Sequence, residues 1–259
     1  MRETRGFVWQ LGVIVSIAAI GMALACAVPS VSHATSISFA GGPTNLLTST
    51  TTIGGIGISA YYWNGSTYLN TPSGGVNAGG PGINGVSLYM KNGGPTEEGL
   101  GVCSPAEQAT SACSPPYTNG GGNINELDNL GAAELIRLEL PAGYLWVSAA
   151  VSSLDTQEAG RVYWSNQANP DLVIDISSAF SAFSSPTNPN PFTINLSSIG
   201  GFDPSAKYLY FQPGHGPTTD NDFLVSAATI GPVPEPSTLL LLASGLVGLG
   251  AARKRYRRK

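Results

Sequence analysis

The sequence predicts an all-β central domain, a β-sandwich of jelly-roll type, on three observations. Glycine supplies 33 of the 259 residues and lies mostly in the central part of the chain, among many Ser, Thr and Asn residues. This composition disfavours helices and supplies turns. Short runs of β-branched and aromatic residues recur between clusters of Gly, Pro and Asn. In the run 134–140, apolar residues alternate with charged ones. This period of two is typical of a strand that has one buried and one solvent-exposed face.

The individual elements follow from these runs. About ten short strands are expected, a number that suits two packed sheets. They cover 36–39, 56–63, 86–90, 134–140, 144–151, 161–165, 172–176, 192–196, 207–212 and 223–230. The stretch 171–183 mixes strand and helix signals, and its part 177–183 could form one helical turn. The glycine-rich segments 71–85 and 118–123 are expected to be loops.

The amino terminus has the organisation of a secretory signal peptide. Two arginines precede an apolar stretch from 7 to 28. Ser32 and Ala34 then place small residues at the two positions that a signal peptidase reads. We predict cleavage after Ala34, so that 1–34 is the signal peptide and the mature protein lies outside the cytoplasm.

Two other interpretations of this end remain open. Ala25 and Ala27 would permit an earlier cut, after Ala27. Cys26 could instead indicate a lipoprotein, although Ala23 stands where a larger aliphatic residue is usual. Each of these interpretations also places the mature protein outside the cytoplasm.

The carboxyl terminus places three segments end to end. The first consists of Val233, Pro234, Glu235, Pro236, Ser237 and Thr238. Its prolines remove backbone donors and favour extended neighbours, which predicts an exposed strip that another protein can reach. The uncharged, leucine-rich segment 238–252 predicts a transmembrane helix, short for a bilayer core that takes about 20 residues. The last segment carries the positive charges that would hold this end in the cytoplasm: Arg253, Lys254, Arg255, Arg257, Arg258 and Lys259.

Motif, apolar run and basic end, in this order, closely resemble the PEP-CTERM sorting signal of Gram-negative bacteria. The resemblance covers 232–259, and the Pro-Glu-Pro residues match the motif position for position. It implies export, transient anchoring in the inner membrane, and removal of the anchor by a membrane-embedded exosortase. It further implies delivery to the outer surface or the exopolysaccharide matrix. The expected processing partners are the exosortase, which would supply the catalytic Cys, and a signal peptidase; Glu235 would be a recognition element.

A second, looser resemblance concerns the domain between the two ends. The segments 99–102 and 125–128, the alternating strand through Leu140, and the segments 153–155 and 220–225 are similar in arrangement to those of many PEP-CTERM ectodomains. Such ectodomains are expected to be β-sandwiches of unassigned function. The resemblance therefore supports the fold more than any role.

The expected ectodomain, 35–232, is strongly acidic. It holds 14 of the 16 acidic residues but only 4 of the 12 basic ones, so its net charge is near −10, against −4 for the whole chain. This balance argues against nucleic acid and anionic lipid as partners of the folded part. A divalent cation suits it better.

Acidic residues gather at two expected loop–strand junctions. Glu126 and Asp128 lie at one, and Asp220 and Asp222 at the other. If the two junctions lie close in space, their hard oxygen ligands would suit Ca²⁺. Neither has the ligand spacing of an EF-hand loop, and solvated acidic pairs are the competing interpretation.

Cys103 and Cys113 are the cysteines that remain after removal of the signal peptide. An oxidising compartment favours their pairing, and we predict a disulfide. Closing so small a loop would contribute about 2–3 kcal/mol in the chain-entropy model, so the bond would order a surface excursion without holding the fold together. A metal site at this pair would lack further ligands of the usual kind.

The sequence does not predict an enzyme. His215, the one histidine of the expected ectodomain, lies between two Gly-Pro corners and is interpreted as a turn residue. The chain contains no Gly-x-Ser-x-Gly elbow and no His-Glu-x-x-His motif. Acidic residues that could serve a glycosidase or lyase on number alone are Glu97, Glu98, Glu126, Asp128, Glu134, Asp220 and Asp222.

Sugar binding would need exposed aromatic rings beside polar groups. Tyr61 and Trp63 share a strand face and are the candidates, with burial in the core as the competing interpretation. Trp146 and Phe211 are expected to be core residues.

We therefore predict an exported protein without catalysis of its own, with a structural or adhesive role associated with exopolysaccharide or biofilm. The alternatives are a carbohydrate-binding module, Ca²⁺-assisted or not, and thirdly a glycosidase or lyase.

Overall fold

The chain divides into two units, which are described separately. The computed structural model describes residues 33–40, 45–46, 48–70, 85–94, 96–105, 107, 126–128, 133–154, 158–174, 180–184, 191–214, 222–233 and 244–247. One unit is His33–Pro232, and the other consists of Met1–Ser32 and Val233–Lys259.

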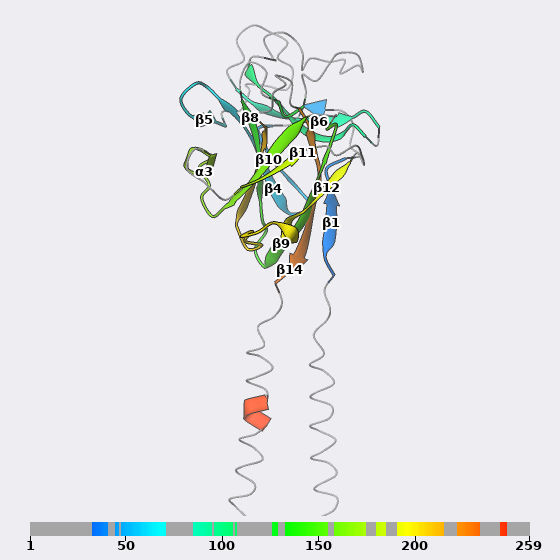
Figure 1. Cartoon of the computed structure of the whole chain (residues 1–259), viewed down its shortest axis with the longest axis vertical. Helices are drawn as coiled ribbons and strands as arrows, with labels where there is room; N and C mark the ends of the chain where they lie inside the picture. Colours follow the sequence, from blue (N-terminus) through cyan, green and yellow to red (C-terminus); the bar gives the residue numbers. More distant parts are fainter. Residues whose placement is uncertain are drawn as a thin grey trace, which may run out of the picture. The chain divides into compact units, whose positions relative to one another are not determined.

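Little of the second unit belongs to the described residues. Residues 244–247 are helical (Figure 1). Within the part of the chain that the structure describes, no helix is long and apolar enough to cross a membrane. Residues 1–32 of the predicted signal peptide and the basic segment fall outside the described residues, as does most of the predicted helix 238–252, and these predictions therefore stay predictions.

The unit His33–Pro232 is built from two antiparallel sheets of seven strands each (Figure 1). The first sheet runs in the order β12 (Phe192–Asn195), β9 (Tyr144–Ser152), β14 (Leu224–Pro232), β7 (Glu98–Cys103), β6 (Ser87–Asn92) and β2 (Asn45–Leu46), and β1 (Thr35–Ser38) also pairs with β14. The second runs in the order β11 (Phe180–Ser184), β10 (Ala159–Ser165), β13 (Tyr208–Pro213), β8 (Glu134–Glu139), β4 (Ile56–Trp63) and β3 (Thr50–Ile53), and β5 (Tyr68–Leu69) also pairs with β4. The prediction of an all-β fold is confirmed.

The two sheets share one hydrophobic core. It includes Val151 and Ile230 from the first sheet and Leu138 and Phe211 from the second. The alternation in β8 is confirmed, because Ile136, Leu138 and Leu140 all belong to this core, whereas Arg137 and Glu139 are only partly buried. Trp146 and Phe211 are buried, as predicted. The indole Nε1 of Trp146 donates a hydrogen bond of 2.8 Å to the Ala206 carbonyl, which satisfies its one polar group.

A second apolar cluster lies on the other face of the second sheet, and we call it the outer cluster. Its buried members are Tyr61, Tyr68, Leu135, Tyr163, Val173, Tyr208 and Tyr210. Along β4, β8 and β13 these residues alternate with those of the shared core, because successive side chains of a strand point to opposite faces. The stretch 167–174 is fastened to this face. The Arg137 guanidinium donates to the Ala168 carbonyl at 2.6 Å, and the Tyr210 hydroxyl donates to the Gln167 carbonyl.

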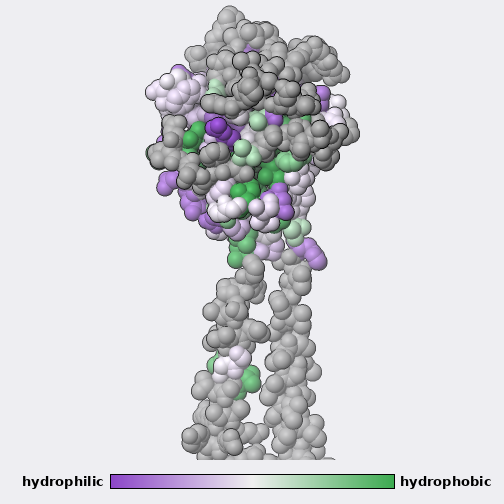
Figure 2. Space-filling model, viewed as in Figure 1, coloured by the Kyte–Doolittle hydropathy of each residue, from purple (hydrophilic) through white to green (hydrophobic). Residues whose placement is uncertain are grey.

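Few large apolar side chains are exposed on the described surface of the same unit. On the face drawn in Figure 2, small apolar areas stand among polar ones. Among the described residues of His33–Pro232, the large apolar side chains that remain exposed are Tyr144, Val147 and Leu172. Scattered single residues of this kind are normal for a soluble surface.

The structure corrects two predictions in the stretch 171–183. In place of a strand at 172–176, Asp171–Ile174 forms the short helix α3. Local capping explains the helix, because Asn169 Oδ1 accepts the Asp171 N–H at 3.1 Å and the Pro170 carbonyl accepts the N–H groups of Val173 and Ile174. In place of a helical turn at 177–183, Phe180–Ser184 forms β11, which pairs with the edge of β10.

Candidate functional site

Three carboxylates meet where the chain passes from β7 of the first sheet to β8 of the second. Glu107 follows β7, Asp128 precedes β8, and Glu134 is the first residue of β8. Each of these residues offers one oxygen atom, and the three oxygens lie within 4.8 Å of one another. The residues are between 0% and 4% exposed. We call them the acidic trio.

The backbone holds the acidic trio together from both sides. An isolated antiparallel bridge joins Leu127 to Phe223, with N–H to carbonyl distances of 2.8 and 3.3 Å. Asp128 then donates its N–H to Glu134 Oε2 at 3.3 Å, and its carbonyl accepts the Glu134 N–H at 3.2 Å. These bonds fix the start of β8 against the segment 126–128.

Glu107 is oriented by a local motif. Its Oε2 accepts the Ser104 N–H at 2.7 Å and the Ser104 hydroxyl at 3.2 Å. Ser104 and Glu107 thus have the S-x-x-E spacing of a capping box, in which the glutamate reaches back to the serine N–H.

Burial dominates the electrostatics of the acidic trio. It raises the pKa of the Glu107 carboxyl to about 8, and the nearby Asp128 charge acts in the same direction. Burial also holds the pKa of Glu134 well above its ordinary value, and the charges of Glu107 and Asp128 raise it further. Carboxyls so close together in a low-dielectric site either retain protons or are neutralised by a cation.

The four cationic side chains of 35–232 are placed elsewhere. Lys91 pairs with Glu126 and, at 3.1 Å, with Glu97. Lys207 makes a partly exposed pair with Glu139 at 3.1 Å. Arg137 lies on the outer cluster, 4.9 Å from the ring centre of Tyr208, and Arg161 stands opposite Gln212 in the ladder between β10 and β13.

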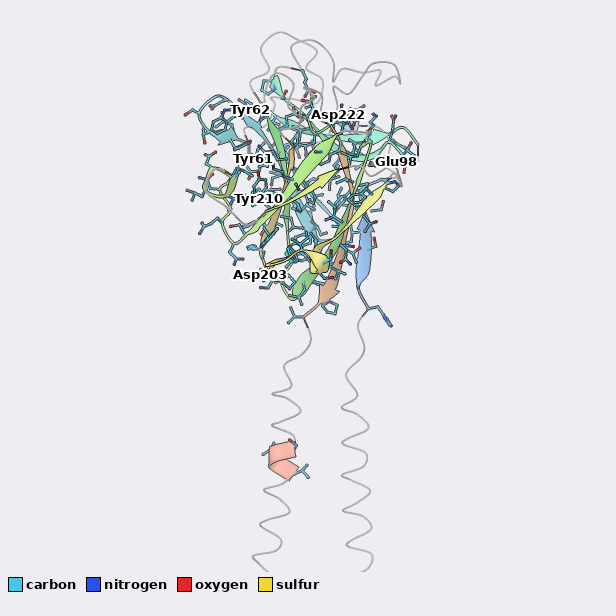
Figure 3. The ribbon with its side chains drawn as sticks, in the orientation of Figure 1. Tyr61, Tyr62, Glu98, Asp203, Tyr210 and Asp222 are labelled. Atoms are coloured by element: carbon cyan, nitrogen blue, oxygen red, sulfur yellow. The ribbon has the colours of Figure 1, made fainter. Side chains whose placement is uncertain are left out.

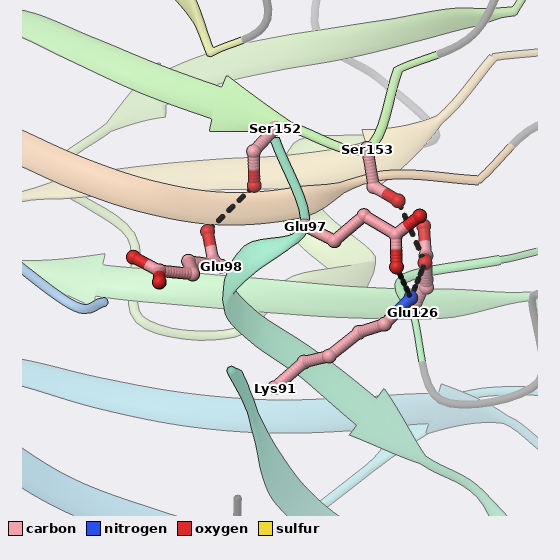
Figure 4. A network of polar contacts seen from close by, with 6 residues as sticks. All are labelled: Lys91, Glu97, Glu98, Glu126, Ser152 and Ser153. Atoms are coloured by element: carbon pink, nitrogen blue, oxygen red, sulfur yellow. Dashed lines mark hydrogen bonds and ion pairs between the residues drawn. The ribbon is translucent and has the colours of Figure 1, made fainter. Parts of the chain in front are cut away.

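Lys91 and Glu126 form the centre of a second polar network (Figure 4). The Ser153 hydroxyl donates to Glu126 Oε1 at 2.7 Å, and Ser153 adopts a left-handed backbone conformation, with φ 61°. Burial raises the pKa of Glu126 above its ordinary value, although Lys91 and Ser153 act against that shift. Burial would by itself lower the pKa of Lys91, but Glu126 and Glu97 together raise it.

The structure brings the two acidic junctions of the sequence side by side but uses their residues differently. The bridge between Leu127 and Phe223 sets 126–128 against 222–224. Asp128 joins the acidic trio, Glu126 joins the Lys91 network, and Asp222 is buried beside the bridge. Asp220 lies outside the described residues, as do Cys113 and His215.

Sequence reasoning placed neither Glu107 nor Glu134 in a metal set. A signal for each was nevertheless present. The period-two pattern of β8 puts Glu134 on the same face as Ile136 and Leu138, which implies a buried carboxylate. The capping-box spacing from Ser104 gives Glu107 a fixed orientation.

Tyr61 and Trp63, the candidate sugar-binding residues, lie in and beside the outer cluster. Tyr61 is 8% exposed, and Arg137 stands 5.4 Å from its ring centre. Trp63 is partly buried and packs against Tyr68 with ring centres 5.1 Å apart. Of these two rings, that of Trp63 is the more open to solvent.

The other predicted site residues are placed as follows. Ala34, the predicted cleavage position, is exposed, and so is Val233 at the start of the predicted sorting strip. Cys103 is buried at the end of β7. The remainder of the strip, 234–238, and the basic segment 253–259 lie outside the described residues, so the disulfide and the sorting contacts stay predictions.

The comparisons with known proteins concern the sorting tail. A family model described as the PEP-CTERM protein-sorting motif matches residues 232–255. The chain is thus an all-β protein that carries a PEP-CTERM sorting motif at its carboxyl-terminal end, which supports export, membrane-linked processing and targeting to an exosortase. No curated protein and no solved structure matches the chain.

Proposed function

We propose that this protein is a surface or matrix component of a Gram-negative bacterium, with a β-sandwich ectodomain in a structural or adhesive role beside exopolysaccharide. The observation that carries the proposal is the sorting motif at 232–255, joined to an acidic all-β unit. In this account a signal peptidase removes 1–34, and an exosortase then reads Pro234–Glu235–Pro236. The anchor serves only until that cut.

A role without catalysis is consistent with the positions of the acidic side chains. Glu126, Asp128, Glu134 and Asp222 are each no more than 2% exposed. A glycosidase needs two carboxyl groups that flank the scissile bond of a bound sugar, and so must be reachable by it. These four buried carboxylates thus support a structural use better than a catalytic one, and the more exposed Glu97 pairs with Lys91.

The delivery step can be tested by mass spectrometry of the protein from cells with and without exosortase. We expect the product from normal cells to begin after Ala34 and to lack the apolar and basic segments. Cells without exosortase should retain the full carboxyl terminus. A product that keeps 238–259 in normal cells would be a permanently anchored protein and would contradict the proposal.

A carbohydrate-binding module remains the second candidate, because Trp63 is a partly exposed ring that packs against Tyr68 of the outer cluster. Aromatic stacking on sugar would be lost in Trp63→Ala, with Leu172→Ala as the control at an exposed apolar residue. We expect the two variants to sediment with purified exopolysaccharide to the same extent as the unchanged protein. Loss of sedimentation in Trp63→Ala alone would establish the module instead.

A further inference from the structure

We propose that Glu107, Asp128 and Glu134 bind a calcium ion that fastens the crossover between the two sheets. This site goes beyond the proposed surface role and does not depend on it. The two acidic junctions first suggested calcium with a different set of ligands. The geometry points to the acidic trio, of which Asp128 alone belonged to that set.

The spacing of the oxygens fits a calcium coordination sphere. Calcium binds oxygen ligands at about 2.3–2.6 Å, so two ligands on opposite sides of the ion are about 4.6–5.2 Å apart and adjacent ligands are closer. The three oxygens of the acidic trio lie within 4.8 Å of one another. A single ion can therefore contact all three without rearrangement of the strands.

A separate observation at Glu134 indicates that this position takes a ligand. Its side chain is fully buried, and no N–H or hydroxyl group among the described residues donates to its Oε1. The carboxyl of Glu107, another acidic group, lies within hydrogen-bonding reach of the Glu134 side chain. The other oxygen of Glu134, Oε2, accepts the Asp128 N–H. A buried carboxylate oxygen without such a donor costs about 1–3 kcal/mol or more, because it has lost its hydration. A metal ion at the acidic trio would offset this cost by contacting the Glu134 carboxylate directly.

The charge balance of the ectodomain supports a cation from outside the chain. The connection 104–133 contains the three acidic residues Glu107, Glu126 and Asp128, with Glu134 directly after it, but no Lys or Arg residue. Of the four cationic residues of 35–232, Lys91 pairs with Glu126 and Lys207 with Glu139, while Arg137 lies on the outer cluster. Arg161 lies on β10, opposite Gln212. A divalent cation would neutralise two of the three carboxylates at once.

The chemistry of the acidic trio selects calcium among common ions. All three ligands are carboxylate oxygens, which suit hard cations, whereas structural zinc prefers Cys and His. Magnesium dehydrates reluctantly and usually keeps several waters, for which a site that is 0–4% exposed leaves little room. Backbone carbonyls or single waters would complete the coordination of calcium.

Binding would join two segments that carry the chain from one sheet to the other. Glu107 lies just after β7, and Glu134 opens β8. An ion held by both would tie the end of one sheet to the start of the next. Binding in the range of about 10⁻⁴ to 10⁻³ M, typical of extracellular modules, would suffice for an exported protein.

The test is thermal unfolding of the full-length chain in detergent, after treatment with EDTA and with added CaCl2. At about 10 mM CaCl2 the melting temperature should rise by about 5–10 °C over the EDTA value. Glu107→Gln, Asp128→Asn and Glu134→Gln should each lose most of this shift. Asp203→Asn, which removes an exposed charge at the other end of the unit (Figure 3), should keep it.

A measurement on the unchanged protein keeps the test decisive if a variant does not fold. Tb³⁺ should show luminescence sensitised by Tyr62, which stands opposite Glu134 in the ladder of β4 and β8, and CaCl2 should quench it by competition. A melting temperature that CaCl2 leaves unchanged would overturn the proposal and identify the acidic trio as proton-sharing carboxyls. A shift of equal size with MgCl2, or one that survives in all three variants, would overturn it as well.

Discussion

Replacement of Lys91 by methionine is expected to lower the free energy of unfolding by about 3 kcal/mol at neutral pH. The change leaves the aliphatic part of the side chain but removes the ammonium that pairs with Glu126. Glu126 is 2% exposed, so its carboxylate would stay buried without a cation. We place the effect at the lower end of the range for buried pairs because the Lys91 side chain is itself 22% exposed. Urea unfolding of the two proteins measures the difference.

The loss should depend on pH in a defined direction. Burial already raises the pKa of Glu126 in the unchanged protein, and removal of Lys91 would raise it further. An acid whose pKa is higher in the folded than in the unfolded state favours folding at low pH and loses that contribution as pH rises. The deficit of Lys91→Met should therefore be small near pH 5 and should grow toward pH 8.

Two variants control this experiment. Lys207→Met breaks the pair with Glu139, whose side chains are 52% and 39% exposed, and should cost at most about 1 kcal/mol. The double variant Lys91→Met/Glu126→Gln removes both charges of the pair and should recover much of the loss. Equal losses in Lys91→Met and Lys207→Met would show that burial of Glu126 does not matter.

The sequence predicted most strands because their side chains carry the signal themselves. β4 was predicted with the bounds that the structure has, since 56–63 is a continuous run of β-branched, aromatic and small residues. β7 was missed because glycines interrupt it. One of them, Gly99, is required by packing, since a Cβ atom there would lie 2.9 Å from the Val225 carbonyl oxygen. A glycine that looks like a turn in the sequence thus marks a close approach of two strands.

The errors at 171–183 have a different origin. There the local sequence pattern fits both a strand and a helix, and contacts with residues distant in the sequence decide the secondary structure. The free edge of β10 pairs with β11, and Asp171 accepts the Tyr68 N–H at 2.8 Å, which holds the start of α3 against β5. No pattern within the stretch itself contains this information.

Only part of the candidate site could be predicted from the composition and spacing of residues in the sequence. The two acidic junctions were found, and the bridge between Leu127 and Phe223 brings them together. Strand register decides which of these acidic residues belongs to which group. Lys91 of β6 is placed so that it pairs with Glu126, whereas Asp128 lies with Glu107 and Glu134 in the acidic trio. Pairing between strands distant in the sequence decides this selection, and the sequence alone did not determine it.

Phe211→Ala is expected to be the most damaging single truncation in the second sheet. Phe211 is fully buried in the shared core on β13, where it stands opposite Val162 of β10 and Ile136 of β8. Deleting a buried phenylalanine ring costs about 3–5 kcal/mol, because transfer energy is lost and the cavity closes only in part. The corresponding fall in melting temperature is roughly 6–20 °C for a domain of this size.

The matched control is Val147→Ala on β9, where the side chain is 36% exposed, and this variant should change stability by no more than about 0.5 kcal/mol. Phe211→Leu should fall between the two, since leucine fills part of the cavity. If Phe211→Ala lowered stability no more than Val147→Ala, the two sheets would not be packed through this residue, and our assignment of Phe211 to the shared core would be wrong. Because the unit is held together chiefly by that core, the order of these three variants tests the packing of the two sheets directly.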